Sequence, residues 1–173
     1  MANIFAVDPS LTETGVAWNK GEQIVSRTIA SKNTASARMI ELRSELRDQL
    51  QFVNPDLIVI EAPAFASKGR SVKEIGGIWW QYRVMMYELG MRVLEVPPSF
   101  LKKYATGHGN AKKIEVVQAA WQRLDYEGTN DNVADALWLH QIGLKMLKDP
   151  MAIELPAINT STWSKLGEEA KWS

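Results

Sequence analysis

Three carboxylates stand at positions where hydrophobic packing gives no reason for an acid. Asp8 follows the apolar run 4–7, Glu61 ends a second apolar run at 57–60, and Asp135 lies among alanines early in a predicted helix. A carboxylate removed from water is costly unless a cation or a hydrogen-bond donor meets it. Clustered carboxylates without sulfur ligands suit hard divalent ions such as Mg²⁺. The three acids therefore indicate a metal site, provided that folding brings them together.

Each acid also has a simpler interpretation. Asp8 precedes Pro9, and Asp-Pro is a common turn dipeptide. Acids in the first turn of a helix, such as Asp131, complement the helix dipole and cap its amides. Asp135 lies too deep in the helix for capping. Because two strands of one small sheet end in an acid, we favour a shared site.

The pattern of apolar residues predicts the elements that must position these acids. We expect three strands joined by short turns, then a helix with an apolar stripe, a buried strand that ends at Glu61, and alternating helices and strands. The predicted strands cover 4–7, 15–18, 23–29, 56–61 and 91–96, and the predicted later helices cover 74–89, a short one from Pro98, 111–124 and 130–148.

Two of the helices carry further predictions. Helix 74–89, with adjacent Trp79 and Trp80, has more apolar surface than one sheet face needs, which indicates either a protein–protein interface or two buried indoles. Helix 111–124 is predicted to turn one face inward, formed by Ile114, Val117, Ala120, Trp121 and Leu124.

Composition narrows the class of protein. The 173 residues suit one domain, which we place at 1–150, followed by a C-terminal tail at 151–173 that lacks periodicity. The absence of cysteine excludes disulfides and thiolate metal sites, and two histidines make structural zinc a poor fit. The sequence shows no signal-peptide pattern and no apolar run of membrane-spanning length, so we expect a cytoplasmic protein.

Net charge is zero, with 20 basic and 20 acidic side chains, but the charges are not evenly mixed, and the charged residues of two segments are all basic. Residues 65–73 and 96–114 contain no acid. Such segments supply phosphate contacts even in a neutral protein. Their basic side chains are Lys68, Arg70, Lys73, Lys102, Lys103, Lys112 and Lys113, together with His108.

The order of these motifs resembles the ribonuclease-H-like fold, an α/β architecture with a mixed five-stranded sheet flanked by helices. Within that superfamily the chain is most similar to the RuvC-type Holliday junction resolvases, especially the short versions carried by phages. The resemblance covers roughly 4–148 and rests on five motifs taken together: DPSLTETG from Asp8, IVIE ending at Glu61, VPPSFLKK from Val96, TGHGNAKK from Thr106 and DNVADAL from Asp131.

The resemblance implies a metal-dependent endodeoxyribonuclease that acts as a homodimer on four-way junctions, and also on forks, leaving 5′-phosphate and 3′-hydroxyl ends by paired nicks. Two Mg²⁺ ions, with Mn²⁺ able to substitute, would lie about 3.5–4 Å apart to activate water and stabilise the leaving oxygen. Asp8 would bridge the two ions, while Glu61 and Asp135 would each bind one. Lys113 would offset charge on the scissile phosphate, and Phe65 would stack on an unpaired base. Lys102 matches a second family lysine, and the remaining basic side chains would hold phosphates.

One position departs from the family pattern, which places two aspartates three residues apart on the last helix. Asn132 stands three residues before Asp135, and Asp131 stands four before it. Both positions share a helix face with Asp135. Because a carboxylate attracts a divalent ion more strongly than an amide does, we expect Asp131 to be the fourth ligand, with Asn132 as a helix cap or a weak second ligand.

Three other functions compete with junction resolution. A different nuclease of the same fold would cut RNA–DNA hybrids, flaps or forks, and carboxylates alone do not separate these substrates. A nucleotide-binding half of a kinase or ATPase would need a second domain, for which 173 residues leave no room. A DNA-binding module without catalysis would not need intact Asp8, Glu61 and Asp135.

Overall fold

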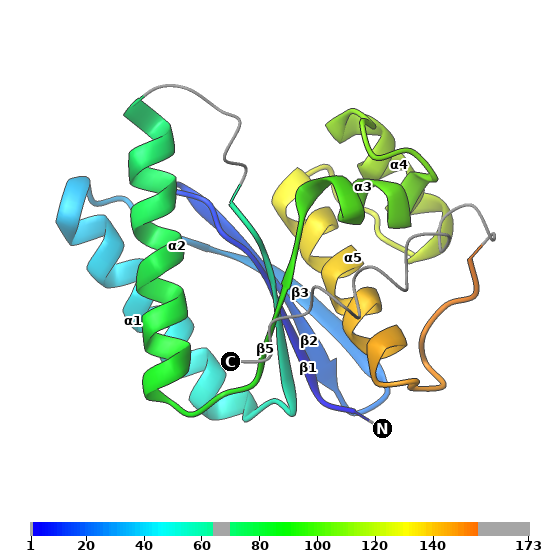
Figure 1. Cartoon of the computed structure of the whole chain (residues 1–173), viewed down its shortest axis with the longest axis horizontal. Helices are drawn as coiled ribbons and strands as arrows, with labels where there is room; N and C mark the ends of the chain where they lie inside the picture. The colour runs from blue at the N-terminus through cyan, green and yellow to red at the C-terminus, as the bar shows by residue number, and fades with distance from the viewer. Residues whose placement is uncertain (1, 64–69, 156–173) are drawn as a thin grey trace.

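The computed structural model describes residues 2–63 and 70–155, with residues 70–72 described by their backbone only. Five strands and five helices follow one another along this part of the chain (Figure 1). The strands are β1 (Ile4–Asp8), β2 (Glu13–Lys20), β3 (Gln23–Ala30), β4 (Leu57–Glu61) and β5 (Val93–Val96). The helices are α1 (Ala35–Val53), α2 (Arg70–Glu88), α3 (Pro98–Thr106), α4 (Lys113–Arg123) and α5 (Asp131–Met146).

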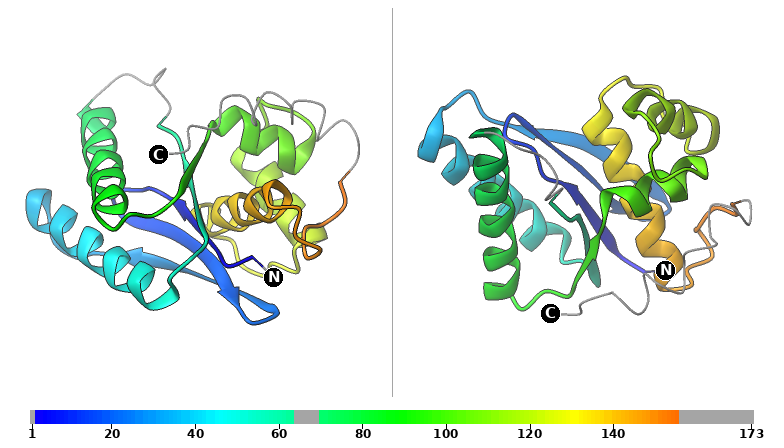
Figure 2. Two further views of the ribbon diagram at one scale, coloured as in Figure 1. Left: turned by 60° about the horizontal axis from the view of Figure 1, so that its bottom comes forward. Right: turned by 45° about the horizontal axis from the view of Figure 1, so that its top comes forward.

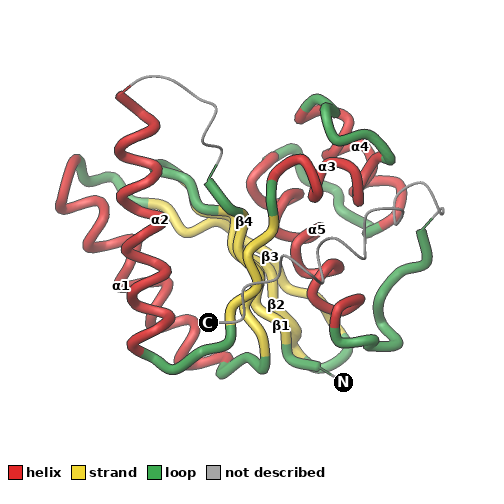
Figure 3. The backbone as a smooth tube through the Cα atoms, viewed as in Figure 1, coloured by secondary structure: helices red, strands yellow, loops and turns green. Residues whose placement is uncertain are grey.

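The strands form one mixed sheet in the order β3-β2-β1-β4-β5. The hairpins β1–β2 and β2–β3 are antiparallel, whereas β4 pairs in parallel with both β1 and β5. Helices α1 and α2 cover one face of the sheet, and α3, α4 and α5 cover the other (Figures 1 and 2). This arrangement confirms the predicted fold class, and the tube view separates its layers clearly (Figure 3).

Side-chain alternation along the strands divides the hydrophobic core in two. Phe5 and Val7 of β1 pack against buried residues of α1 and α2, whereas Ile4 and Ala6 belong to the core on the α5 side. Successive residues of a strand point to opposite faces of the sheet. The next residue of β1, Asp8, therefore points to the α5 face.

Helix α5 approaches the sheet closely at two glycines. A Cβ atom at Gly15 of β2 would lie 2.0 Å from the backbone carbonyl oxygen of Asn132. A Cβ atom at Gly143 would lie 2.8 Å from methyl groups of Ile4 and Val59. At both glycines α5 and the sheet are so close that there is no room for a side chain. The distance between α5 and the strand ends depends on them.

One prediction about a helix face needs correction. On α4 the buried residues include Val116, Val117 and Ala120, while the predicted inward residues Ile114 and Trp121 are 53% and 41% exposed. The Trp121 indole N–H instead donates to the backbone of Gly128, a contact beyond the end of the helix that helical periodicity does not predict.

The adjacent tryptophans of α2 differ in burial, since Trp79 is buried and Trp80 is 64% exposed.

Beyond α5, residues 151–155 add partly buried side chains to the core on the α5 side. None of the helices in the described part of the chain is long and apolar enough to span a membrane.

Candidate metal and catalytic site

The sheet register places two of the predicted acids side by side. Val7 of β1 pairs with Ile60 of β4 in the parallel ladder, so Asp8 and Glu61 follow as the last residues of neighbouring strands. Parallel strands bring their carboxyl ends to the same edge of a sheet, and alternation turns both acids toward α5. Each strand thus delivers one carboxylate to a common point.

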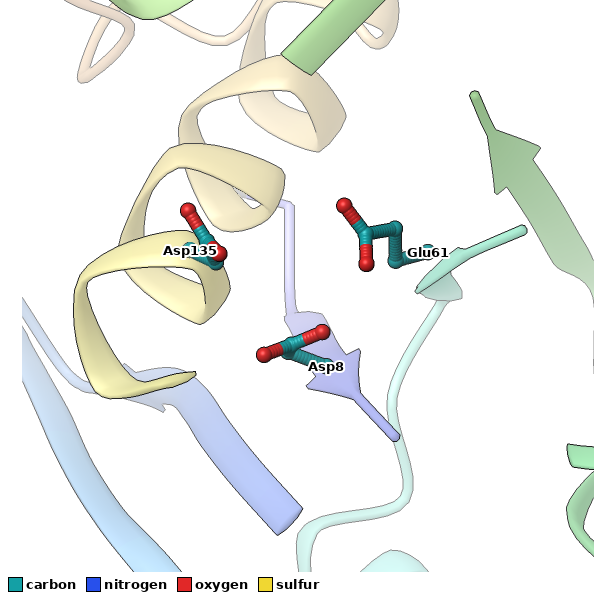
Figure 4. Close-up of side chains that lie close together, drawn as sticks. All are labelled: Asp8, Glu61 and Asp135. Carbon is teal, nitrogen blue, oxygen red and sulfur yellow. The ribbon is translucent and has the colours of Figure 1, made fainter. Parts of the chain in front are cut away.

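The first turns of α5 supply the third acid. The helix begins after Asn130, whose side-chain oxygen accepts the Val133 amide as an N-cap. One turn further, Asp135 meets Asp8 and Glu61, and one carboxylate oxygen from each of the three lies within 4.8 Å of the others. The three side chains converge from β1, β4 and α5 (Figure 4). Among the described residues this is the acidic group that could hold a metal ion.

Crowding of the three acids in a buried place disfavours their charged forms. Burial, followed by the charges of Glu61 and Asp135, raises the pKa of Asp8 well above its ordinary range. Burial and the neighbouring acids raise the pKa of Asp135 to about 7, and burial also raises the pKa of Glu61. Asp8 is only 5% exposed. Because oxygen ligands held this close repel one another, the set fits a hard divalent cation that would offset their charge.

A cleft of about 290 Å³ opens above the acids. Lys102 and Lys113 stand at its rim, and their charges lower the pKa of Glu61 and so oppose the effect of burial. Apolar side chains such as Trp79 and Ile75 line the cleft as well, together with the polar Ser10 and Asn132. Carboxylates at the floor and lysines at the rim suit a substrate that carries a phosphate toward a metal.

The two candidates for the fourth ligand have different surroundings. Asp131 makes an ion pair with Lys113 and is not part of the three-acid group. Asn132 lines the cleft beside Asp135, and its amide nitrogen donates to the Glu13 backbone carbonyl at 2.7 Å. With the nitrogen of Asn132 held by β2, its side-chain oxygen is the atom left for a ligand.

The family is identified by the comparison with known proteins. The family model described as "Crossover junction endodeoxyribonuclease RuvC" matches residues 4–140, which include all three acids of the site. The chain belongs to the RuvC family.

Curated RuvC proteins of cyanobacteria resemble the chain over most of their length. The crossover junction endodeoxyribonuclease RuvC of Parasynechococcus marenigrum (strain WH8102) is 30% identical over 146 residues, covering 78% of this chain and 92% of the relative. That of Synechococcus sp. (strain CC9311) is 28% identical over 151 residues with the same coverage. The match to the family thus extends well beyond the short motifs.

Solved structures agree at the level of the fold. The Thermus thermophilus RuvC in complex with a Holliday junction substrate has a TM-score of 0.70, 18% identity and full coverage of both chains. The Fowlpox virus resolvase in complex with Holliday junction DNA has a TM-score of 0.58 and 15% identity, covering 84% of this chain and 98% of that one.

Among the basic residues that the RuvC resemblance implicates, Lys102 of α3 and Lys113 of α4 line the cleft that holds the acids. Lys102 lines the cleft, Lys103 follows it on α3, and exposed Lys112 precedes α4 next to Lys113. Lys73 is exposed on the first turns of α2. Phe65 and Lys68 lie outside the described residues, and Arg70 is the first residue of α2, without a described side chain.

Sequence reasoning did not find three hydrogen-bond contacts that surround the RuvC-type acids. The Trp79 indole donates to the Glu61 backbone carbonyl, the Tyr82 hydroxyl contacts Thr14, and Glu13 binds the start of α5. Each contact joins distant positions in the chain. The closeness of Thr14 to Asp8 in DPSLTETG was the available signal, but no local pattern indicates its partner.

Proposed function

We propose that this chain is a metal-dependent endonuclease that resolves four-way DNA junctions by paired nicks. The observation that carries the proposal is the convergence of Asp8, Glu61 and Asp135 at the floor of a lysine-rimmed cleft, in a chain of the RuvC family. The function matches what the names of its relatives say of those proteins. The products are 5′-phosphate and 3′-hydroxyl ends.

Asp8, Glu61 and Asp135 would hold two Mg²⁺ ions, or Mn²⁺ in their place, with Asp8 shared between them. When bound, such ions supply an activated water and a positive charge for the leaving oxygen. The protein contributes the fixed spacing of the acids, since each is the last or an early residue of a rigid element. Asn132 offers a neutral fourth oxygen, and a neutral ligand weakens the second ion.

Lys113 offsets charge on the scissile phosphate, and Asp131 orients it. The Lys113 side chain is 74% exposed, yet its ammonium group is paired with Asp131 at the edge of the acids. The hydrogen bond from Lys113 to Asp131 raises the pKa of Lys113, so the lysine stays charged over the range in which the enzyme works. A fixed ammonium beside a transferring phosphoryl group stabilises its developing charge.

The remaining basic residues bind DNA phosphates around the cleft. The described candidates are Lys73, Lys102, Lys103 and Lys112; Lys68 and Arg70 are proposed from the sequence, and Phe65 is proposed to stack on an unpaired base at the crossover. Lys102 lines the cleft together with the acids, so a phosphate bound there can contact this lysine. Forks, which share the branched geometry, are secondary substrates.

A homodimer built on α2 would bring two such sites to one junction. Trp80, Val84 and Tyr87 lie one turn apart along one face of α2 and are 64%, 49% and 75% exposed. Large apolar side chains in a row on an exposed helix face are typical of an interface. A second copy of the chain is the fitting occupant, because paired nicks on a two-fold substrate need two sites related by symmetry.

Sedimentation of the wild type should show a dimer at micromolar concentration, and Trp80→Glu should shift it to monomer. Phe52→Glu provides the control, because Phe52 is 85% exposed on α1 and should tolerate the charge. A wild-type monomer that resolves junctions fully would refute the dimer.

The decisive experiment for the function compares cleavage by wild type and Asp8→Asn on a labelled four-way junction, a fork, a linear duplex and an RNA–DNA hybrid, each with Mg²⁺. We expect symmetric nicks on the junction with wild type alone, while junction binding in EDTA is retained by both proteins. Preferential cutting of the hybrid would replace junction resolution by a broader nuclease function of the same fold. Metal-dependent cutting by Asp8→Asn would remove the site assignment.

A further inference from the structure

Helix α2 contacts the end of β4, which carries Glu61, and the start of β2, which follows Asp8 in the chain. Its buried face includes Trp79 and Tyr82, which are three residues apart and therefore lie on the same side of the helix. Trp79 is 5% exposed and its indole N–H donates to the backbone carbonyl oxygen of Glu61 at 2.9 Å. The bond acts directly on the residue that carries the second carboxylate.

The contact of Tyr82 reaches the segment that follows Asp8. The Tyr82 hydroxyl lies 2.9 Å from the Thr14 hydroxyl oxygen, and both side chains are fully buried. Thr14 Oγ1 donates to the Ser10 carbonyl at 3.1 Å and accepts the Ser10 amide at 3.3 Å. Since the single Thr14 proton is used toward Ser10, Tyr82 is the donor to Thr14. The hydrogen bonds thus run from α2 through Thr14 to the turn two residues beyond Asp8.

We propose that Trp79 and Tyr82 are positioning residues that fix the Glu61 and Asp8 carboxylates at the spacing that a divalent ion needs. The catalytic meaning of this inference rests on the proposed function. One carboxylate oxygen from each of Asp8, Glu61 and Asp135 lies within 4.8 Å of the others, so the charged forms repel one another when no cation lies between them. A strand end is anchored less than a strand interior. Hydrogen bonds from one rigid helix to Glu61 and, through Thr14, to the turn after Asp8 oppose a separation of the two acids.

A purely structural role for the two side chains predicts something different. Packing alone would make their loss lower the stability of the fold without changing the metal affinity of the remaining folded protein. A positioning role predicts instead that the substituted protein still folds but binds the metal more weakly. The affinity of the folded protein for Mn²⁺ therefore separates the two roles.

The first test compares Trp79→Phe with Trp121→Phe. Both substitutions remove an indole that donates to a backbone carbonyl, but the Trp121 bond goes to Gly128, away from the acids. We expect Trp79→Phe to weaken Mn²⁺ binding, measured by electron paramagnetic resonance of the free ion, by about three- to tenfold, the loss of one net hydrogen bond. Trp121→Phe should bind Mn²⁺ as the wild type does.

The second test uses Thr14, which also serves if Trp79→Phe fails to fold. Thr14→Val keeps the shape and removes the hydroxyl, whereas Thr14→Ser keeps the hydroxyl. We expect Thr14→Val and Tyr82→Phe to weaken Mn²⁺ binding and Thr14→Ser to restore it. Equal Mn²⁺ affinity in Thr14→Val, Tyr82→Phe and wild type, with each protein shown to be folded by its melting curve, would overturn the proposal.

Cleavage kinetics add a readout that stability does not move. Because positioning acts through metal binding, Trp79→Phe should need more Mn²⁺ for half-maximal single-turnover cleavage of the junction but reach a rate within about twofold of wild type at saturation. A variant whose rate stays low at saturating Mn²⁺ contradicts positioning. If the wild type cuts no junction, the proposed function fails, and the Mn²⁺ affinities still decide the roles of Trp79 and Tyr82.

Discussion

Replacing Asp135 by asparagine should stabilise the metal-free protein at alkaline pH while it removes cleavage. Burial, followed by the charges of Glu61 and Asp131, raises the pKa of this carboxyl from 3.8 to about 7. Below about pH 4 the carboxyl is protonated in the folded and the unfolded chain alike, so it has no effect on the pH dependence. Above pH 7 the folded protein must carry a charge that its surroundings disfavour. The metal-free wild type therefore loses stability as pH rises from 4 through 7.

The size of the effect follows from the same pKa. A carboxyl whose pKa rises from 3.8 to about 7 lowers the free energy of unfolding by about 4 kcal/mol at pH 8. Asp135 is partly open to the cleft, so solvent screening reduces this value, and we expect Asp135→Asn to gain about 2 kcal/mol at pH 8. At pH 4 the gain should be small, because the wild-type carboxyl of the folded protein is then neutral as well.

Urea unfolding in EDTA at pH 4 and pH 8 measures this difference directly. Asp48→Asn is the control, since Asp48 is exposed on α1 and the change should stay within about 0.5 kcal/mol of wild type. Added Mn²⁺ should reverse the order at pH 8, because the ion stabilises the wild-type cluster more than the variant. If Asp135→Asn is no more stable than wild type at pH 8 in EDTA, the charged form of Asp135 does not destabilise the folded protein and the electrostatic reasoning is wrong.

Three further changes test other parts of the structure. Gly15→Ala places a Cβ atom 2.0 Å from a backbone carbonyl of α5, so the helix must move by about 1 Å and cleavage should fall about a hundredfold. The control is Gly76→Ala, whose Cβ atom meets no atom within 4 Å and which should raise the melting temperature. Lys102→Ala should reduce the slope of log junction affinity against log salt by about one and Lys145→Ala should not; equal slopes would place Lys102 away from DNA. Burial lowers the pKa of His140 to about 4, so the wild type loses stability as pH falls from about 6.5 toward 4. By pH 4.5 the free energy of unfolding of His140→Gln should have fallen by about 2 kcal/mol less than that of the wild type. Parallel pH profiles of stability for the two proteins would contradict this.

Local pattern alone determined the elements of this protein and the positions of its acids along them. Alternation and apolar runs predicted the strands, and the buried strands β1 and β4 were the clearest because a strand between two helical layers must be apolar along its length. An acid at the end of such a run needs a partner, and the recurrence of this pattern at Asp8 and Glu61 indicated a shared site. The depth of Asp135 in its helix indicated the third acid in the same way.

The tertiary structure decided how these pieces meet. Asp8 and Glu61 lie side by side because of the β1–β4 register, and Asp135 reaches them because Gly15 lets α5 approach the sheet. The pairing of Lys113 with Asp131, the orientation of Asn132 and the bond from Trp79 to Glu61 also join distant positions. Helical periodicity repeats within a few residues and reports which side of an element is apolar. It does not indicate which backbone carbonyl or side chain of another element a given residue will contact. That contact depends on the packing of the whole sheet and its helices.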